Sequence, residues 1–432
     1  MNGDSFHSVT LDTQKCKGCT TCIRYCPTEA IRVRKGKAYI LDERCIDCGE
    51  CIRVCPNGAK KAVYDPLSAI EQFAVRVAIP APTLYGQFDE HFSVNRILGA
   101  LLKIGFTDIF EVARAAELVS DETASFISKA GPGPWISSAC PAVVKLLQLR
   151  FPSLLDRLVP VVSPMEAAAR IVKERLYPGR NDVGVFFISP CAAKVTVSRN
   201  PQGVASSAVD GVIAIKDVYL PIRNVLPYVQ ERPIATASAK GMAWAHIEGE
   251  SEALALPKAI SVAGIHDIIG VFEALENGKM KDISFIEALA CPAGCVGGPL
   301  TVENPYIARA RIRALEKHPQ ENHTKETENI ELAFSSVLKA SSGLRLSPDR
   351  VKAMLIFEEA EIILESLPGL DCGSCGAPSC RAFAEDVAKG DVALTACIFK
   401  LRENVRKLAQ ELILIESIQP PGLDTSDADD SI

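Results

Sequence analysis

The sequence has no excess of positive charge and no long hydrophobic run. Its 47 lysines and arginines are outnumbered by 53 aspartates and glutamates, a formal net charge of −6. Proteins that bind nucleic acid or anionic membranes in general need a clustered basic surface, so this balance argues against both. No apolar stretch approaches the roughly 18 residues of a membrane span, and the N-terminus lacks the basic and apolar regions of a secretory leader. We therefore expect a cytoplasmic protein that binds neither nucleic acid nor membrane.

Nucleotide-binding fingerprints are missing as well. The sequence contains neither a Walker loop nor a Rossmann glycine motif, so direct use of a nucleotide is not expected. The histidines show no ligand spacing, and we treat all of them as structural or surface residues: His7, His91, His246, His266, His318 and His323. What the chain does contain is cysteine, 16 in 432 residues. Disulfides seldom persist in a reducing compartment, so metal ligation is the leading interpretation.

An internal repeat fills the first 60 residues. The segment CKGCTTCIRYCPTEAI from Cys16 recurs as CIDCGECIRVCPNGAK from Cys45, 29 positions later. Each copy has the spacing C-x2-C-x2-C-x3-C-P, the bacterial ferredoxin run in which three thiolates hold one 4Fe-4S cube and the fourth holds the other. A zinc site would normally use one or two C-x2-C pairs with a long spacer. We predict a two-cluster module over residues 1–63, with Cys16, Cys19, Cys22 and Cys55 on one cluster and Cys45, Cys48, Cys51 and Cys26 on the other.

Another cysteine quartet lies near the C-terminus, in a predicted domain over residues 341–418. Its opening, LPGLDCGSCGAPSC, resembles a small iron–sulfur domain of electron-transfer and corrinoid proteins, which implies a third 4Fe-4S cluster. Zinc remains an alternative, because the spacing C-x2-C-x4-C-x16-C does not exclude it. A helix capped by Ser347 is predicted ahead of the quartet. The four ligands would be Cys372, Cys375, Cys380 and Cys397.

The last predicted helix, LRENVRKLAQELILIES, carries apolar residues at a 4-3-4-3 spacing that is typical of a coiled-coil seam. These residues are Leu401, Val405, Leu408, Leu412 and Ile415. Two interpretations stay open: the helix packs on its own domain, or it joins two copies of the chain as a homodimer. The small, acidic composition of residues 419–432 predicts a disordered tail.

The middle of the chain, residues 64–340, alternates strand-like runs with helical patterns. The runs FAVRVAI, VGVFFIS and ISFIEALA are typical of an α/β domain with parallel sheets. The four remaining cysteines each follow such a run or a short loop, and parallel strand ends converge on one crevice. Four unrelated buried thiols would be ordinary one by one, but the combination favours a further cube. Its ligands would be Cys140, Cys191, Cys291 and Cys295.

Three segments around these cysteines resemble the H-cluster motifs of the iron-only (FeFe) hydrogenases, in family order. SSACP resembles T-S-C-C-P, SPCAAK resembles M-P-C-x-x-K, and EALACPAGCVGGP resembles E-x-M-x-C-x-x-G-C-x-x-G-G. The resemblance, which covers residues 1 to about 315, implies a multidomain α/β fold. It also implies an H-cluster, a 4Fe-4S cube joined to a diiron unit that carries carbon monoxide, cyanide and an azadithiolate. Cys295 would bridge the two parts, Lys194 would hydrogen-bond a cyanide, and Ala81 and Pro82 would shape the pocket.

Four positions depart from the family pattern. Ala139 stands where catalytic members have a cysteine that passes protons, Ser189 and Leu289 replace methionines near the diiron unit, and Val197 replaces a glutamate. A methyl group cannot carry a proton, so the usual relay is cut. A chain that keeps the ligands of the cube but lacks the proton relay resembles the sensory members of the family. These members are slow and report hydrogen to regulatory partners.

We therefore expect a slow enzyme that interconverts dihydrogen with protons and electrons, senses hydrogen, and exchanges electrons with ferredoxin or a signalling protein. Two alternatives stay open. One is an ordinary ferredoxin-linked hydrogenase with a different proton path. The other is a non-catalytic iron–sulfur relative without the diiron unit.

Overall fold

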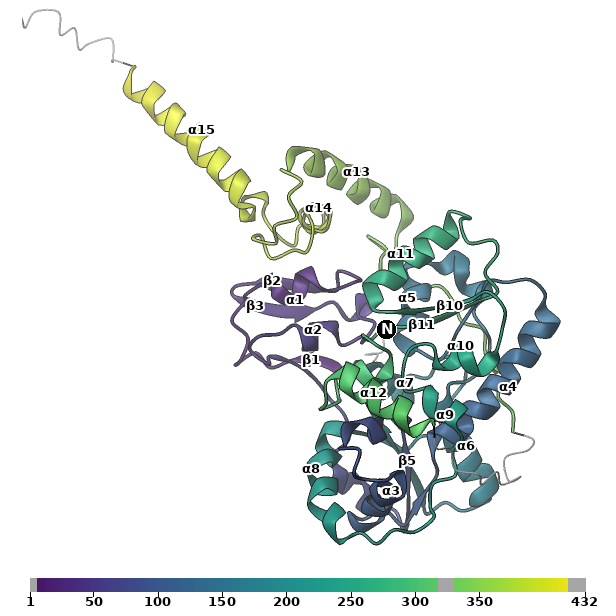
Figure 1. Cartoon of the computed structure of the whole chain (residues 1–432). Helices are drawn as coiled ribbons and strands as arrows, with labels where there is room; N and C mark the ends of the chain where they lie inside the picture. The colour runs from purple at the N-terminus through teal and green to yellow at the C-terminus, as the bar shows by residue number, and fades with distance from the viewer. Residues whose placement is uncertain (1–5, 318–329, 419–432) are drawn as a thin grey trace, which may run out of the picture.

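The computed structural model describes residues 6–317 and 330–418, in three regions that follow one another along the chain (Figure 1). A small module of short strands and helices comes first, a large α/β domain follows, and a helical region comes last. The expected acidic tail at residues 419–432, with His318 and His323, lies outside the described residues. In the part of the chain that is described, no helix is long and apolar enough to cross a bilayer.

The sequence repeat of the N-terminal module is also a structural repeat. Each copy contains a strand, a short helix and a second strand, and each strand pairs antiparallel with a strand of the other copy, β1 with β4 and β2 with β3. Both helices follow a residue in the left-handed conformation, Thr20 in the first copy and Gly49 in the second. The elements are β1 (Val9–Leu11), α1 (Thr21–Arg24), β2 (Ile31–Arg34), β3 (Lys37–Ile40), α2 (Glu50–Arg53) and β4 (Lys60–Ala62).

The larger sheet of the α/β domain has four parallel strands in the order β6-β5-β8-β9. Two of its strands coincide with the predicted runs, and apolar residues point to both faces because helices cover both. The strands are β5 (Val75–Pro80), β6 (Asp108–Ile109), β8 (Val183–Ser189) and β9 (Gly211–Ala214). One face packs against α3 (Val94–Lys103), α8 (Ile215–Val225) and α12 (Pro305–Leu315). The other packs against α4 (Val112–Ala130), α6 (Pro164–Ile171) and α7 (Ala192–Arg199).

A second parallel sheet, in the order β10-β11-β7, lies beside the first. Its strands are β7 (Trp135–Ile136), β10 (Ala259–Ala263) and β11 (Phe285–Leu289), the last of which lies inside the third predicted run. Ile136 and Ile286 pack against α5 (Pro141–Arg150) and α11 (Ile265–Glu276). The short helices α9 (Ala239–Ala243) and α10 (Gly249–Leu254) complete the domain. The observed architecture is the mixed α/β fold with parallel sheets that the sequence predicts.

The C-terminal region contains three helices, α13 (Arg350–Ser366), α14 (Cys380–Ala388) and α15 (Ile398–Glu416). The first two pack together around a small core that includes Phe383. The predicted cap of the first helix is wrong by two residues: Asp349, not Ser347, accepts a hydrogen bond from the Lys352 N–H, at 2.8 Å. A carboxylate at this position also suits the positive end of the helix dipole.

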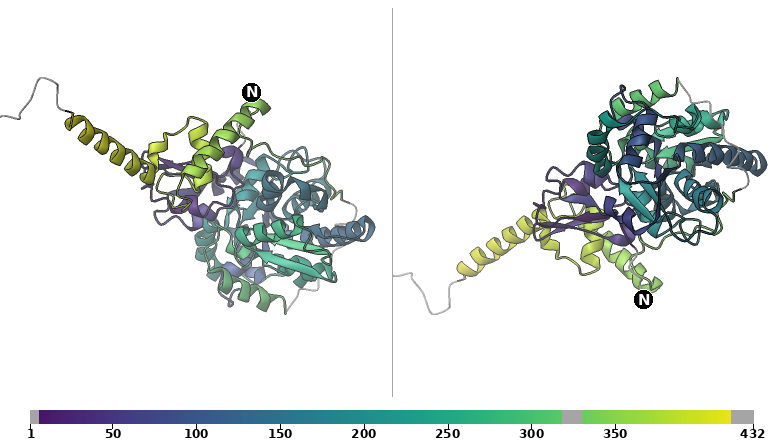
Figure 2. Two further views of the ribbon diagram at one scale, coloured as in Figure 1. Left: turned by 90° about the horizontal axis from the view of Figure 1, so that it is seen from above. Right: turned by 90° about the horizontal axis from the view of Figure 1, so that it is seen from below.

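The last helix projects away from the rest of the described chain, as all three views show (Figures 1 and 2). No residue of α15 is buried. The five predicted seam residues, from Leu401 to Ile415, are 44–64% exposed. Packing of this helix on its own domain is therefore not what the structure shows.

Candidate metal centres

The two ferredoxin-type quartets line two separate cavities of about 330 Å³ each. Cys16, Cys19, Cys22 and Cys55 line the first cavity. Cys26, Cys45, Cys48 and Cys51 line the second. The structure thus brings the cysteines together in the predicted combinations, in which each run contributes its fourth cysteine to the cavity of the other.

Backbone N–H groups point at the sulfurs of the two crossing cysteines. Ala30 donates to Cys26 Sγ and Ala59 donates to Cys55 Sγ, both at 3.2 Å. Burial raises the pKa of the Cys55 thiol, but N–H groups of Lys60 and Ala59 outweigh it, so this pKa is lowered overall. Such donors stabilise thiolates and help set the potential of a bound iron–sulfur cluster.

Lys60 supplies a buried positive charge between the two cavities. Its side chain is buried, and its Nζ has no hydrogen-bond partner among the described residues. Burial raises the pKa of the Cys22 and Cys51 thiols, and the Lys60 ammonium opposes this rise; it also contributes to the lowered pKa of Cys55. A buried, unpaired cation is costly unless an anion lies beside it. An iron–sulfur cube with four thiolate ligands is such an anion, so Lys60 fits that cofactor; sequence reasoning missed it, because a lone lysine on a short strand carries no motif.

The C-terminal quartet lines a third cavity, also of about 330 Å³, between α13 and the start of α15. A zinc ion bound to four thiolates at about 2.3 Å would draw the sulfurs to within about 4 Å of one another. Among the described residues, the only group of three potential ligand atoms within 4.8 Å of one another is His7, Cys45 and Asp47, so no three cysteine sulfurs approach that closely. This wider spacing of the sulfurs fits a cofactor larger than a single zinc ion.

The four cysteines of the α/β domain lie at the ends of strands or the starts of helices, as predicted. Cys140 and Cys191 are the N-caps of α5 and α7, Cys291 follows β11, and Cys295 begins a one-turn 3₁₀ helix. They lie together: burial raises the pKa of the Cys191 thiol, and Cys291, Cys140 and Cys295 reinforce the shift. Burial also raises the pKa of the Cys295 thiol, to about 12.

Lys194 lies one turn into α7 and faces this cysteine group. It is buried, and its positive charge counteracts the rise in pKa at both Cys295 and Cys191. Its Nζ lies 5.9 Å from the centre of the Phe187 ring. The lysine is therefore a cation held at the thiolates, where an anionic ligand would be stabilised.

The predicted pocket residues lie at the neighbouring strand ends. Ser189 ends β8 and exchanges hydrogen bonds of 3.0 Å with the backbone of Cys191, while Leu289 ends β11 and is buried. Ala81 and Pro82 follow β5, and the buried turn that begins there, Pro82–Gln87, contacts the Cys295 turn. Their buried neighbour Thr83 has a hydroxyl without a hydrogen-bond partner among the described residues.

An orphaned hydroxyl in such a position is costly unless a polar ligand takes it up. Thr83 therefore fits a cofactor that presents hydrogen-bond acceptors beside Cys295. Sequence reasoning did not select this residue, although it directly follows the Ala-Pro pair that was selected.

A chain of buried polar groups begins at Ala139. The Ala139 N–H donates to Ser137 Oγ at 3.2 Å, and Ser137 Oγ donates to a carboxylate oxygen of Glu250 at 2.6 Å. Burial, together with the neighbouring Glu287, raises the pKa of Glu250 to about 8. Burial also raises the pKa of Glu287, and its Oε1 has no partner in the described chain.

Ser137 therefore connects the Glu250 carboxylate to the backbone of Ala139, and Glu287 lies close enough to act on the pKa of Glu250. Glu287 is the first residue of the segment EALACPAGCVGGP, whereas Glu250 lies outside all three motif segments. Only folding brings Glu250 to Ser137, across 113 positions of sequence.

The ferredoxin-like module meets the α/β domain at Arg53. Its positive charge acts on the thiols of both Cys48 and Cys291, and the side chain donates a hydrogen bond of 3.1 Å to the backbone oxygen of Gly297. At the same contact, a Cβ on Gly49 would come within 2.5 Å of the Pro299 ring. Arg53 thus lies close to a cysteine of the second cavity, Cys48, and to a cysteine of the α/β domain, Cys291.

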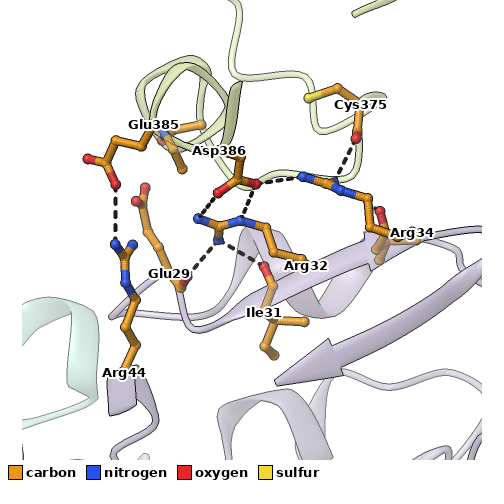
Figure 3. Close-up of polar contacts among 11 residues, drawn as sticks. Glu29, Ile31, Arg32, Arg34, Arg44, Cys375, Glu385 and Asp386 are labelled. Carbon is orange, nitrogen blue, oxygen red and sulfur yellow. Dashed lines mark hydrogen bonds and ion pairs between the residues drawn. The ribbon is translucent and has the colours of Figure 1, made fainter. Parts of the chain in front are cut away.

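On its other side, the module carries the C-terminal region (Figure 3). Val33, which lines the first cavity, donates its N–H to the Gly376 oxygen at 2.8 Å. Arg24 and Arg34 donate to the backbone oxygens of Cys372 and Cys375, at 2.9 and 3.0 Å. The loop that carries two cysteines of the C-terminal quartet thus lies directly on the wall of the first cavity.

Comparison with known proteins agrees with these cysteine centres. Residues 8–56 match the family model described as a 4Fe-4S dicluster domain, and residues 367–399 match an Fe-S cluster family. The chain is thus an iron–sulfur protein. Residues 74–224 and 223–299 match the family described as "Iron only hydrogenase large subunit, C-terminal domain". The chain belongs to this family.

Individual relatives are distant. The periplasmic Fe hydrogenase large subunit of Nitratidesulfovibrio vulgaris is 24% identical, over 72% of this chain and 90% of that protein. Iron hydrogenase 1 of Clostridium pasteurianum is 26% identical over 62% of this chain, and the match spans only 58% of that longer protein. A solved structure of the FeFe-hydrogenase HydA1 from Chlamydomonas reinhardtii aligns with 65% of this chain and 90% of its own, at 17% identity and a TM-score of 0.44.

Proposed function

We propose that this chain is a slow hydrogenase that responds to dihydrogen and relays electrons through its iron–sulfur clusters. The observation that carries the proposal is the convergence of Cys140, Cys191, Cys291 and Cys295 beside Lys194, in a chain of the iron-only hydrogenase family. When bound, an H-cluster supplies the interconversion of dihydrogen with protons and electrons. The chain's own residues hold that cofactor, exclude water and place charge around it.

The roles of the residues follow from their chemistry. The four thiolates would hold the cube, and Cys295 would also hold the diiron unit. Lys194 offers an ammonium to an anionic cyanide ligand, which is a charge-assisted hydrogen bond. Thr83 offers a neutral hydroxyl from the neighbouring strand end, that of β5. The buried turn Pro82–Gln87 restricts water at the same place.

Slow turnover follows from Ala139. Its side chain has no group that can give or take a proton, and a positioned acid or base typically contributes about 10²–10⁴ in rate. Such an enzyme would still convert dihydrogen to two protons and two electrons, but slowly, so that it consumes little hydrogen. This combination suits a sensor better than a producer of hydrogen.

The packing supports one order for the electron relay. The C-terminal quartet lies on the wall of the first cavity, through Val33 and Gly376. The first and second cavities share the ferredoxin-like module, and Arg53 joins the second cavity to Cys291. Electrons would pass from the hydrogen site to the second cavity, then to the first cavity and then to the C-terminal cluster, or in the reverse order. A ferredoxin or a signalling protein would bind the chain at its C-terminal end.

The buried carboxyl pair favours a second candidate, an ordinary hydrogenase with its own proton path. Glu250 reaches Ala139 through Ser137, and a carboxyl group with a pKa of about 8 can both hold and release a proton near neutral pH. In this case Glu250→Gln would lower turnover by about 10²-fold or more. In the sensory case, the same substitution changes an already low rate by less than tenfold.

One experiment separates these functions. The purified chain is loaded with a diiron precursor, infrared bands of carbon monoxide and cyanide are recorded, and hydrogen turnover is measured before and after Ala139→Cys. The sensory proposal expects the bands, low turnover, and a gain of about 10²–10⁴ on introducing the thiol. Ala139→Ser is the matched control, because its hydroxyl has similar size but is a much weaker acid. Absence of the bands contradicts both hydrogenase functions, and high turnover of the unchanged chain contradicts the sensory one.

A further inference from the structure

Helix α15 presents a complete apolar seam with no partner in the described chain. The seam is one residue longer at its start than the sequence pattern suggested, because the helix begins at Ile398. In heptad positions, Ile398, Val405 and Leu412 are a residues, and Leu401, Leu408 and Ile415 are d residues. All six are exposed. Three unbroken a/d pairs on a projecting helix indicate a second helix as the natural occupant.

The charges beside the seam do not suit a parallel pair. In a parallel dimer a g residue faces the e residue five positions later on the other helix. Glu411 would then face Glu416 of the second copy, twice by symmetry. The only basic flanking residue, Arg402, would face the start of the other helix at Cys397. This orientation brings like charges together and leaves the arginine without an acidic partner.

An antiparallel pair removes this conflict. Pairing Val405 with Leu408 of the second copy also pairs Ile398 with Ile415 and Leu401 with Leu412, so that one register buries all six seam residues. In this orientation e residues lie opposite e residues, and the side chains of Arg402 and Glu416 of the second copy point toward each other. Two such pairs form by symmetry, and Asn404 lies beside Glu411 of the second copy.

The residues beside the seam and on the outer face differ in character, and Ile413 and Leu414 on the outer face are exposed apolar residues that this register does not bury. Ala409, the middle e residue, is small and lies near the two-fold axis, so the helices can approach closely. On the outer face, Glu403 accepts from Lys400 at 2.9 Å and Lys407 at 3.1 Å, whereas Arg402, Glu411 and Glu416 form no ion pair in the described chain. Among the charged residues of α15 without an ion pair in the described chain, Arg402, Glu411 and Glu416 flank the seam and Arg406 lies on the outer face.

We propose that α15 pairs with α15 of a second copy of this chain as an antiparallel two-stranded coil. The arrangement places the tip of each helix beside the start of the other. Cys397 of the two copies would then be separated by about 28 Å along the coil, at 1.5 Å per residue. The C-terminal clusters of the two copies would stay apart, and each chain would keep its own electron relay.

The test is the self-association of the full-length, cluster-loaded protein, measured by sedimentation equilibrium. We expect a dimer, weakened about tenfold by Glu416→Arg and likewise by Arg402→Glu, and restored when both substitutions are combined. Gln410→Glu, on the outer face, is the matched control and leaves the dissociation constant unchanged. Higher salt should weaken the dimer of the unmodified chain, because it screens the attraction between Arg402 and Glu416. At no salt concentration should either single variant form a tighter dimer than the unmodified chain.

The parallel and antiparallel orientations predict opposite effects of Glu416→Arg on the affinity of the dimer, so the measurement distinguishes them. In a parallel dimer Glu416→Arg would relieve the repulsion by Glu411 and tighten the dimer, which would overturn the proposal. A chain that stays monomeric at all accessible concentrations would also overturn it. Binding of that monomer to vesicles of anionic lipid through α15 would assign the apolar face to a membrane surface instead.

Discussion

The guanidinium of Arg32 and the carboxylate of Asp386, 354 positions apart in sequence, form a two-pronged ion pair. Nε donates to Oδ2 at 2.7 Å, and Nη2 donates to Oδ1 at 3.1 Å (Figure 3). Arg32 is buried almost completely. Arg34, two residues further along β2 and on the same face of the strand, also forms an ion pair with this carboxylate. Arg44 and Glu385 add a further pair. The C-terminal region is therefore attached to the ferredoxin-like module by charges that water scarcely screens.

Removing the carboxylate should loosen this attachment. Asp386→Asn leaves the buried Arg32 without its counter-charge, and breaking a buried pair by removing one partner costs about 3–5 kcal/mol. We expect the Val33 N–H, which donates to Gly376, to lose protection against hydrogen exchange. Glu361→Gln is the control, since it removes an exposed pair with Arg381 that is worth about 1 kcal/mol or less. Equal exchange in the two variants would contradict a structural role for Asp386.

Removing the charge of Lys60 should lower the reduction potential of the module's clusters. The buried ammonium stabilises the more negative, reduced form of a neighbouring cluster, so Lys60→Met makes reduction harder. The shift is followed by redox titration with electron paramagnetic resonance detection. Lys61→Met changes the adjacent, exposed lysine of β4 and should leave the potentials in place. Identical potentials in both variants would argue against a charge effect at Lys60.

Glu250 should make the stability of the protein fall as the pH rises. Its pKa is about 8 in the fold, against about 4.3 in an unfolded chain, so the folded state binds the proton more tightly. The free energy of unfolding therefore declines between about pH 4.5 and pH 8, by a few kcal/mol at most. Glu250→Gln has no proton to lose and removes this decline. Thermal unfolding at a series of pH values checks it, with Glu252→Gln, an exposed change on the same helix, as the control.

The C-terminal quartet should hold iron and not zinc. If it binds a 4Fe-4S cluster, Cys380→Ala lowers the iron content by about four atoms per chain and leaves zinc unchanged. The infrared bands of the loaded hydrogen site should persist, because that site lies in another domain. A loss of one zinc with constant iron would identify the quartet as a zinc site.

The parts of the molecule that the sequence could predict are those with local patterns. The runs FAVRVAI and VGVFFIS became β5 and β8, because continuous apolar strands belong in a sheet covered on both faces. The two ferredoxin quartets were predictable in their crossed combination, since their spacing reflects the geometry of the cofactor. The apolar spacing of the last helix predicted a seam, but not whether its own domain would cover it.

Other features depend on contacts between distant segments and on burial. Lys60 and Thr83 look unremarkable in sequence, and they gain meaning only because folding buries them without a partner in the described chain. Glu250 is one of many acidic residues until Ser137 is placed beside it. The pairing of Arg32 with Asp386 could not be predicted, because nothing in either segment indicates which surface the other will meet.

The crossing of Cys26 and Cys55 between the two cavities of the N-terminal module has a consequence for assembly. Neither half of the repeat contains a full ligand set, and each half contributes a strand to the sheet of the other. Metal binding is folding free energy in such a site, so the halves should mature together or not at all. Oxidative loss of iron from one cavity would then undo the second, so that a damaged chain would lose both clusters of the module together.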